Sequence, residues 1–296
     1  MEKQNLSIQI RFPYCPGHCV FCEEKTYGEN ITAATRYRRA LEKEIAAASE
    51  ELNDYTITSV RLGGGALGTL GYGSLENFID ILQHSIPSGP ETVWIAELLP
   101  SEISDMNLAI LKQHRVRHIS LGIMGMTKEE LRALHRPYSI NLVEHSLQLL
   151  PQTEMKVSAA LVIGIPGQTP EQLSAHTERL ARAGFQEVRL LRFHDKTISP
   201  ARQREYAEET DWRGFIGAAE RTLSAAGYER RGSSLVFALP GPDFFPEDSL
   251  PDTGAVMGFG VGAVTRLDGL SYRNTERMEI YLDHSDSFED IAIVDR

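Results

Sequence analysis

The sequence predicts an α/β protein in which a parallel sheet is covered by helices. From residue 6 onward, short apolar runs rich in β-branched residues alternate with longer helical stretches, and this pattern recurs about six times. Such alternation is typical of parallel strands joined by helical connections. In addition, the helical stretches open with residues that favour helix N-caps. Because no clear break interrupts the six units, we expect one continuous sheet, either open and doubly wound or forming an incomplete barrel.

The predicted strands are the runs that combine β-branched and other apolar residues. They are expected at residues 6–12, 57–62, 92–98, 117–123, 156–164 and 187–193. The predicted helices begin at residues whose side chains accept hydrogen bonds from free backbone N–H groups. These starts are Thr32, Ser74, Ser101, Thr127, Thr169 and, approximately, Asp211. Thr127 and Glu130 form a capping-box pattern, Pro170 suits a first helical position, and Gly184 and Gly227 are expected helix ends.

After Gly227 the sequence changes in character. Residues 230–254 contain four of the 14 prolines, and residues 257–269 are rich in glycine and apolar residues. We expect a long loop followed by strands that cover one end of the sheet. The barrel core is assigned to residues 1–200, and residues 201–296 to a C-terminal helix, this loop and the covering strands within the same domain. A second domain beginning near Pro200 is the alternative.

Composition excludes several classes of protein. The 296 residues are 42% hydrophobic and carry 41 acidic and 30 basic side chains, which gives a net charge of −11. A negative surface repels phosphate backbones, so nucleic acid is not an expected partner. No apolar run reaches the roughly 18 residues of a membrane span, and the N-terminal residues do not resemble a secretory signal. We therefore expect a cytoplasmic protein with no membrane partner.

The three cysteines lie within eight residues of one another. Cys15, Cys19 and Cys22 form a C-x3-C-x2-C pattern directly after the first predicted strand. An odd, closely spaced set is not a disulfide framework, and clustered thiols in a reducing compartment typically bind metal or carry out redox chemistry. Three thiolates from one loop suit zinc or an iron–sulfur cluster.

The identity of the metal follows from the number of ligands. A closed zinc site needs a fourth ligand, and His18 is poorly placed to share a metal with its neighbour Cys19. A [4Fe–4S] cluster held by three cysteines has one open iron, which can bind a substrate or cofactor. The pattern therefore favours a [4Fe–4S] cluster, with structural zinc or unliganded thiols as the alternatives.

Two further motifs follow predicted strands. Gly63, Gly64 and Gly65 come after the second strand, where missing side chains let a ligand approach the backbone N–H groups. Glu97 ends the third strand, and its alternative role is that of a solvated carboxylate at a strand end. The segment 163–170, with the sequence IGIPGQTP, follows the fifth strand.

The cysteine spacing, with the aromatic Phe21 before the third cysteine, resembles the characteristic motif of the radical S-adenosylmethionine (SAM) superfamily. The resemblance implies that the open iron is chelated by the amino and carboxylate groups of SAM. It also implies that one electron from the cluster cleaves SAM to methionine and a 5′-deoxyadenosyl radical, which requires an electron donor such as flavodoxin or ferredoxin. The cofactor-binding positions implied in this way are Phe21, Gly63, Gly64, Gly65, Glu97, Arg136, Ile163 and Gly164.

Within this superfamily the chain resembles the oxygen-independent coproporphyrinogen oxidase-like branch, which also contains haem chaperones and methyltransferases. The matching segments are IRFPYCPGHCVFC, RLGGG, ELLPSEIS, SLGIMGMTKEELRALHRP, VIGIPGQTPEQL and GFGVGAVTRL. The fold implied is an incomplete (β/α)6 barrel with the cluster at its top and a C-terminal loop and strand extension. Catalytic loops at the carboxyl ends of parallel strands agree with the general rule for such sheets.

The departures from that branch concern polar residues. Gln9 and Arg11 replace a tyrosine and a histidine, Ala66-Leu67 replaces threonine-proline, Met124 replaces a glutamine and Ala160 replaces an aspartate. Several of these residues hold a second SAM in members that use two, so a second SAM is disfavoured although Arg136 is retained. The chain also ends soon after GFGVGAVTRL, which predicts that the C-terminal domain of the branch is absent. Both observations disfavour coproporphyrinogen decarboxylation and favour a divergent enzyme.

Strand alternation gives an expectation about the substrate. If Ile10 and Phe12 face the helices, Gln9 and Arg11 face the barrel interior. Buried arginines need anionic partners, which are either a carboxylate or phosphate of the substrate or an internal Asp or Glu. The candidate substrate contacts are Gln9, Arg11, Arg61, Met124, Arg192 and His194.

Three functional hypotheses follow. The first is a radical SAM enzyme whose 5′-deoxyadenosyl radical modifies an anionic small molecule or peptide. The second is a haem-binding chaperone of the same branch, and the third is a radical SAM methyltransferase or cyclopropanase, which the lost second-SAM residues disfavour. The sequence singles out no catalytic side chain.

Overall fold

The computed structural model describes residues 3–22, 25–28, 30–241, 255–267 and 269–294. Its strands form one sheet in the order β12-β11-β10-β9-β1-β2-β3-β4-β5-β6-β8-β7. Six of them make a central parallel array: β1 Gln4–Phe12, β2 Tyr55–Gly64, β3 Ser88–Leu98, β4 His118–Met124, β5 Lys156–Ile163 and β6 Glu187–Arg192. These are the six predicted strands, so the α/β class with a parallel sheet is confirmed.

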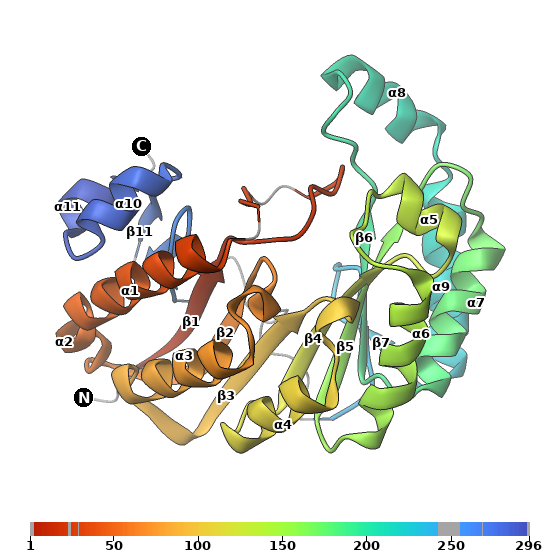
Figure 1. Cartoon of the computed structure of the whole chain (residues 1–296). Coiled ribbons are helices and arrows are strands. Elements are labelled where there is room, and N and C mark those ends of the chain that lie inside the picture. Colours follow the sequence, from red (N-terminus) through yellow and green to blue (C-terminus); the bar gives the residue numbers. More distant parts are fainter. Residues whose placement is uncertain (1–2, 23–24, 29, 242–254, 268, 295–296) are drawn as a thin grey trace.

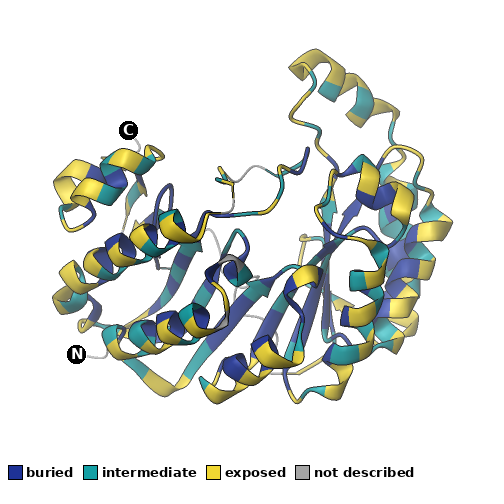
Figure 2. Cartoon of the chain, in the orientation of Figure 1, coloured by how far each residue is buried: buried dark blue, intermediate teal, exposed yellow. Residues whose placement is uncertain are grey.

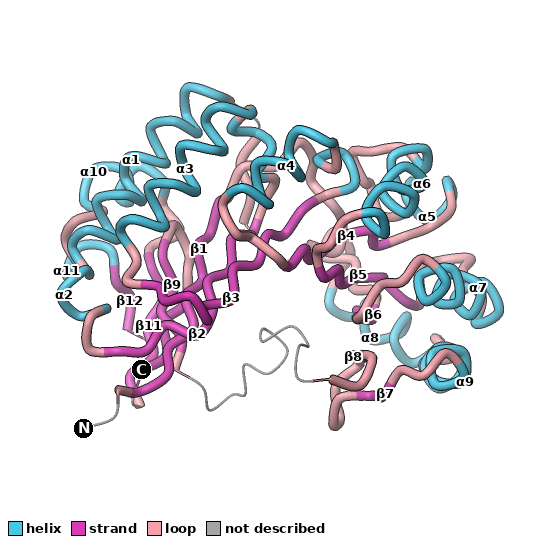
Figure 3. Tube along the Cα trace, turned by 90° about the horizontal axis from the view of Figure 1, so that it is seen from below, coloured by secondary structure: helices cyan, strands magenta, loops and turns pink. Residues whose placement is uncertain are grey.

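The sheet curves into an arc that does not close, with helices on its outer side (Figures 1 and 3). This arrangement agrees with the predicted incomplete barrel. The helices are α1 Ile31–Ala47, α2 Ser49–Leu52, α3 Tyr72–Ser85, α4 Asp105–Gln113, α5 Lys128–Ala133, α6 Ile140–Leu149, α7 Pro170–Arg182, α8 Pro200–Glu209, α9 Trp212–Ala225, α10 Met278–His284 and α11 Phe288–Ile291. Short 3-10 turns lie at Leu67–Leu70, Pro100–Glu102 and Leu150–Gln152.

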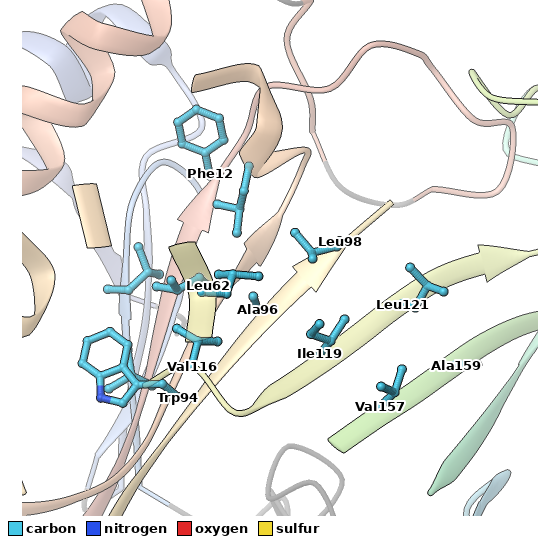
Figure 4. Close-up of a cluster of buried hydrophobic side chains, with 14 of the residues drawn as sticks. Phe12, Leu62, Trp94, Ala96, Leu98, Val116, Ile119, Leu121, Val157 and Ala159 are labelled. Carbon is cyan, nitrogen blue, oxygen red and sulfur yellow. The ribbon is translucent and has the colours of Figure 1, made fainter. Parts of the chain in front are cut away.

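The buried side chains explain why the helices cover one face of the sheet. Along β1 every second residue is buried and the residues between are only half-buried. Figure 4 shows Phe12, Leu62, Leu98 and Ile119, from successive strands, among the buried apolar side chains. Burying about 25 cal/mol per Å² of apolar surface is the main stabilising contribution of such a cluster. The half-buried residues that alternate with these buried ones therefore point to the concave side of the arc.

Three predicted helix starts are confirmed. Thr127 and Thr169 cap α5 and α7 through capping boxes, and Asp211 caps α9 by accepting a hydrogen bond from the Gly214 N–H at 2.9 Å. Thr127 and Thr169 are each followed three residues later by a Glu or Gln that completes the capping box. Local sequence therefore determines these three helix starts.

The other three starts are wrong. Thr32 lies inside α1, which is capped by the side chain of Asn30 and is interrupted at Ala48. Ser74 lies inside α3, and Ser101 lies in a 3-10 turn before the true cap of α4, Ser104. In α1 and α4, a second residue of the capping type lies two or three positions away and makes the hydrogen bond instead.

The C-terminal segment extends the sheet. β9 Val256–Phe259 pairs in parallel with β1, and β10 Val264–Leu267, β11 Leu270–Asn274 and β12 Ala292–Val294 continue the sheet with antiparallel pairing. β9 thus covers the edge that β1 would otherwise expose, and it does so by joining the sheet and not by packing over its face.

Part of the predicted long loop forms structure. Residues 230–254 begin with a hairpin of β7 Glu229–Arg230 and β8 Val236–Ala238, whereas residues 242–254 lie outside the described residues. Helices α6, α8, α10 and α11 were not predicted, and α8 has no buried residue, as Figure 2 shows. Among the described residues, no helix is long and apolar enough to cross a membrane.

Candidate functional site

A cavity of about 660 Å³ lies at the carboxyl ends of the central parallel strands. Cys15, Cys19 and Cys22, from the loop after β1, line it together with the glycine triplet after β2. Glu97 and Arg136 also contribute to its wall. The topology thus gathers motifs that are more than 100 residues apart in the sequence at one end of the sheet.

The cysteine loop is held by backbone contacts. The Cys15 N–H donates to the Tyr27 carbonyl at 2.9 Å, and the Cys22 N–H donates to the Cys19 carbonyl at 3.2 Å. Gly17 packs against Pro137, where a Cβ atom would lie 3.0 Å from the proline Cβ. These contacts fix the loop in a form that brings three thiols to the same cavity.

The thiol arrangement bears on which metal group it can hold. Within the described part of the chain, no three His, Cys, Asp or Glu side chains are gathered closely enough to hold a single metal ion. A [4Fe–4S] cluster binds each cysteine to a separate iron, and all three cysteines line the same cavity. The donor set, three soft thiolates, is also that of iron–sulfur sites.

Arg136 links the cysteine loop to β4. Its guanidinium donates to the Cys19 sulfur at 3.2 Å, to the Tyr138 hydroxyl at 2.8 Å and to the Gly122 carbonyl at 3.0 Å. The aromatic rings of Phe21 and Tyr138 lie 5.9 and 4.7 Å from it. Burial alone would lower the pKa of Arg136, but Tyr138 and Cys19 raise it, so the side chain stays cationic beside the thiols.

The glycine triplet and Glu97 form a second wall. A Cβ atom on Gly63 would lie 1.7 Å from the Glu97 carboxylate, and one on Gly65 would lie 2.3 Å from the Tyr14 carbonyl, so neither position has room for a side chain. Glu97 accepts a hydrogen bond from the Gly64 N–H at 2.9 Å and forms an ion pair with Arg61. It is therefore part of the cavity wall and not a solvated strand end.

The electrostatic state of Glu97 follows from these contacts. Burial raises the pKa of a carboxyl group, but the Arg61 guanidinium and the Gly64 N–H lower it further than burial raises it. The net pKa of Glu97 lies below its ordinary value. Glu97 is thus an ionised acceptor at neutral pH, and Arg61 has an internal acidic partner.

Four candidate substrate contacts line the cavity, namely Arg61, which is paired with Glu97, and Gln9, Arg11 and Met124. Gln9 and Arg11 line it, which confirms the orientation predicted from the alternation along β1. Arg11 donates to the carbonyl groups of Gly262 at 2.9 Å and Lys25 at 3.3 Å. Met124 also lines the cavity and has a left-handed backbone with φ of 64°, which non-glycine residues rarely adopt.

Four other expected site residues are not among the residues that line this cavity. Arg192 and His194 are exposed, and the Arg192 guanidinium lies 5.6 Å from the ring centre of Trp212. Ile163 is buried in the core. At Gly164 a Cβ atom would lie 2.6 Å from the Trp212 ring, so Trp212 covers the turn after β5.

The cavity also contains residues that the sequence analysis did not select. Arg189 lies on β6 opposite Ala160, and its side chain is 3.6 Å from Glu187. The alternation along β6 could have identified it, because Val188 and Leu190 are buried and Arg189 has the opposite orientation. Arg273, from β11, also lines the cavity. No sequence signal indicated Arg273, because only the fold brings that strand near β1.

Comparison with known proteins places these observations in a family. The Radical SAM superfamily profile matches residues 10–180, and the chain belongs to this superfamily. Within it, the chain is similar to the coproporphyrinogen oxidase-like branch, as the sequence motifs indicated.

Two curated relatives and one solved structure illustrate that similarity. Heme chaperone HemW of Lactococcus lactis is 23% identical over 299 residues, which cover 95% of this chain and 75% of the relative. The oxygen-independent coproporphyrinogen-III oxidase-like protein HemZ of Bacillus subtilis is 25% identical over 61% of this chain and 40% of its own length. The structure of coproporphyrinogen III oxidase (HemN) from Escherichia coli matches with a TM-score of 0.80 at 18% identity, over 99% of this chain and 73% of that one.

Membership of the superfamily implies a [4Fe–4S] cluster and SAM. The residues present fit both groups, because three thiols and a cationic side chain share a cavity with a glycine turn that lines it.

The chain spans less than half the length of several of the curated relatives it matches, HemW of Bacillus subtilis among them.

Proposed function

We propose that this protein is a radical SAM enzyme that generates a 5′-deoxyadenosyl radical and uses it to modify an anionic small molecule or peptide. Cys15, Cys19 and Cys22 would hold the cluster. When bound, the cluster and SAM supply one-electron cleavage of the sulfonium to methionine and the radical. The observation that carries the proposal is the shared cavity of the three thiols, the glycine triplet, Glu97 and Arg136.

The side chains around the cavity have separate tasks in this proposal. Arg136 provides positive charge beside the cysteine loop, where it stabilises the anionic thiolates. The backbone of Gly63, Gly64 and Gly65 lines the cavity and would lie against the polar end of SAM. The ion-paired Glu97 would accept hydrogen bonds from SAM hydroxyl or amino groups. Leu98, Leu99 and Leu191 lie in the same wall and exclude water from the reacting groups.

The charge of the cavity supports an anionic substrate. Among the described residues that line the cavity, six are basic and two are acidic, whereas the whole chain carries a net charge of −11. Such a local reversal of sign attracts anions into the cavity. An electron must also reach the cluster, and we expect flavodoxin or ferredoxin as its source.

Anaerobic reconstitution with iron and sulfide, followed by dithionite and SAM, tests the proposal. Mass spectrometry should detect 5′-deoxyadenosine and methionine, and replacing Cys15, Cys19 and Cys22 by Ala should abolish both. If the sulfonium is cut at another bond, methylthioadenosine will form instead. Tight zinc binding without cluster assembly would contradict the proposal.

A second candidate is a haem chaperone. The similarity to HemW of Lactococcus lactis over 95% of this chain favours it specifically. Haem titration separates the candidates, because stoichiometric binding with a shifted Soret band indicates a chaperone. An enzyme alone would leave the Soret band of free haem unchanged.

A further inference from the structure

We propose that Arg11 and Arg273 form a carboxylate-binding clamp at the mouth of the cavity, so that the C-terminal strands provide half of a substrate-anchoring site. The proposal deepens the proposed function, on which it rests, by assigning a carboxylate to the substrate and naming the residues that bind it. Its evidence is the way the two guanidinium groups meet at Gly262.

The two arginines converge on one backbone atom. The Arg11 guanidinium donates to the Gly262 carbonyl at 2.9 Å, and that of Arg273 donates to the same oxygen at 3.4 Å. Arg11 comes from β1 and Arg273 from β11, and both line the cavity. Two cations near one point repel each other, and an anion bound between them removes that repulsion.

The chemistry of arginine points to a carboxylate. A guanidinium carries five N–H donors in a planar fork that matches the two oxygens of a carboxylate. Within the described part of the chain, the Arg273 guanidinium donates through only one of its terminal nitrogens, to the Gly262 carbonyl. Its side chain is exposed at the cavity mouth and can meet an incoming ligand. Glu276 lines the same mouth, and its negative charge opposes anion binding there.

The turn that carries Gly262 is firmly held. The buried Glu44 accepts hydrogen bonds from the Gly260 N–H at 2.8 Å, from the Asn274 amide and from the Tyr281 hydroxyl. The Tyr37 hydroxyl donates to the Arg11 carbonyl at 2.6 Å and accepts from the Val261 N–H at 3.0 Å. The turn that receives both guanidinium groups is therefore fixed to α1 and to the backbone of β1. A fixed acceptor preorganises the clamp before the ligand arrives.

The test uses citrate as a polycarboxylate probe and isothermal titration calorimetry of the full chain with its cluster reconstituted. SAM is present at saturating concentration, so that it occupies the open iron, and no reductant is added. Citrate should bind the unmodified protein, and more weakly as the salt concentration rises. Arg273→Gln should weaken binding about tenfold or more, because a hydrogen bond to a charged group is lost. Arg11→Gln should do the same, and Glu276→Gln should strengthen binding because it removes a repelling charge.

Arg277→Gln is the matched control. Arg277 is exposed, lies four residues after Arg273 and is not among the residues that line the cavity, so its variant should bind citrate like the unmodified protein. Thermal unfolding of each variant checks that the fold is retained. No citrate binding to the unmodified protein, or equal weakening by Arg273→Gln and Arg277→Gln, would overturn the clamp. Because these titrations involve no SAM cleavage, failure of the clamp is distinct from failure to form 5′-deoxyadenosine.

Discussion

At Gly63 the chain has no room for a side chain. An added Cβ atom would meet the Glu97 carboxylate at 1.7 Å, so Gly63→Ala must displace either Glu97 or the strand. We expect it to cost about 1–3 kcal/mol of unfolding free energy and to lower 5′-deoxyadenosine formation strongly. Denaturant titration and the SAM cleavage assay measure the two effects.

A second glycine provides the comparison for that prediction. Gly73 lies in α3, and an added Cβ atom there has nothing within 4 Å. Gly73→Ala should stabilise the protein by about 0.5–1 kcal/mol, because alanine favours a helix over glycine. Equal effects of the two substitutions on SAM cleavage would contradict a special role for Gly63.

Arg136 serves through its shape as well as its charge. It contacts Cys19, Tyr138 and Gly122 at once, and a lysine ammonium cannot reproduce this planar set of donors. Arg136→Lys should therefore weaken SAM binding by about tenfold or more, since charge-assisted hydrogen bonds are lost. Equilibrium dialysis of SAM against the reconstituted protein measures this change. Arg132→Lys, at an exposed position of α5, should leave it unchanged.

The buried carboxyl group of Glu44 joins α1 to the C-terminal strands and to α10. Burial raises the pKa of Glu44 to about 7, although hydrogen bonds from Tyr281, Gly260 and Asn274 partly oppose the shift. The titratable groups that interact with it are the hydroxyls of Tyr37, Tyr272 and Tyr281. Glu44 therefore takes up a proton more readily in the folded than in the unfolded chain.

The sign of the pH effect follows from that difference. A raised pKa in the folded state gives stability that is fully present below the unfolded value of 4.5 and is lost as the pH rises through about 7. Denaturant titrations between pH 5 and 8 should show this decline, on the order of 3 kcal/mol. Glu44→Gln, which is neutral throughout, should show a flatter profile. The same pH dependence in both proteins would exclude Glu44 as its source.

The elements differ in how far the sequence determines them. All six central strands were predicted, because a strand buried on its outer face carries its pattern locally. Three helix starts were wrong, in α1 and α4 because another capping residue satisfied the first turn, and α6, α8, α10 and α11 were not recognised. α8 has no buried residue, so it carries no amphipathic pattern for prediction.

The same distinction applies to the site. The cysteine loop, the glycine triplet and Glu97 follow strands directly, and their meeting at one end of the sheet follows from parallel topology. Arg192 was selected where Arg189 lines the cavity, because the alternation was applied to β1 but not to β6. Arg273 depends on long-range pairing of the C-terminal strands with the barrel, which no local pattern reveals.

At the level of the whole molecule, the C-terminal segment is integral to the fold. β9 covers the edge of β1, and Met257, Phe259 and Tyr281 are buried in the main core. Deleting residues 255–296 would expose that edge and a substantial apolar surface. We expect the shortened chain to aggregate or to unfold at a markedly lower temperature. Size-exclusion chromatography and calorimetry would show this, and a monomer with an unchanged melting temperature would contradict it.

The backbone of Met124 gives the cavity a mechanical property. A left-handed conformation costs a residue with a Cβ atom on the order of 1 kcal/mol, which the surrounding packing must supply. The end of β4 therefore stores conformational strain in the wall of the cavity. Met124→Gly should remove this strain and raise the unfolding free energy by about that amount. It should also make the backbone of the cavity wall more flexible, so that the ligand is oriented less well. Greater stability would then accompany poorer turnover, which denaturant titration and the 5′-deoxyadenosine assay would reveal together.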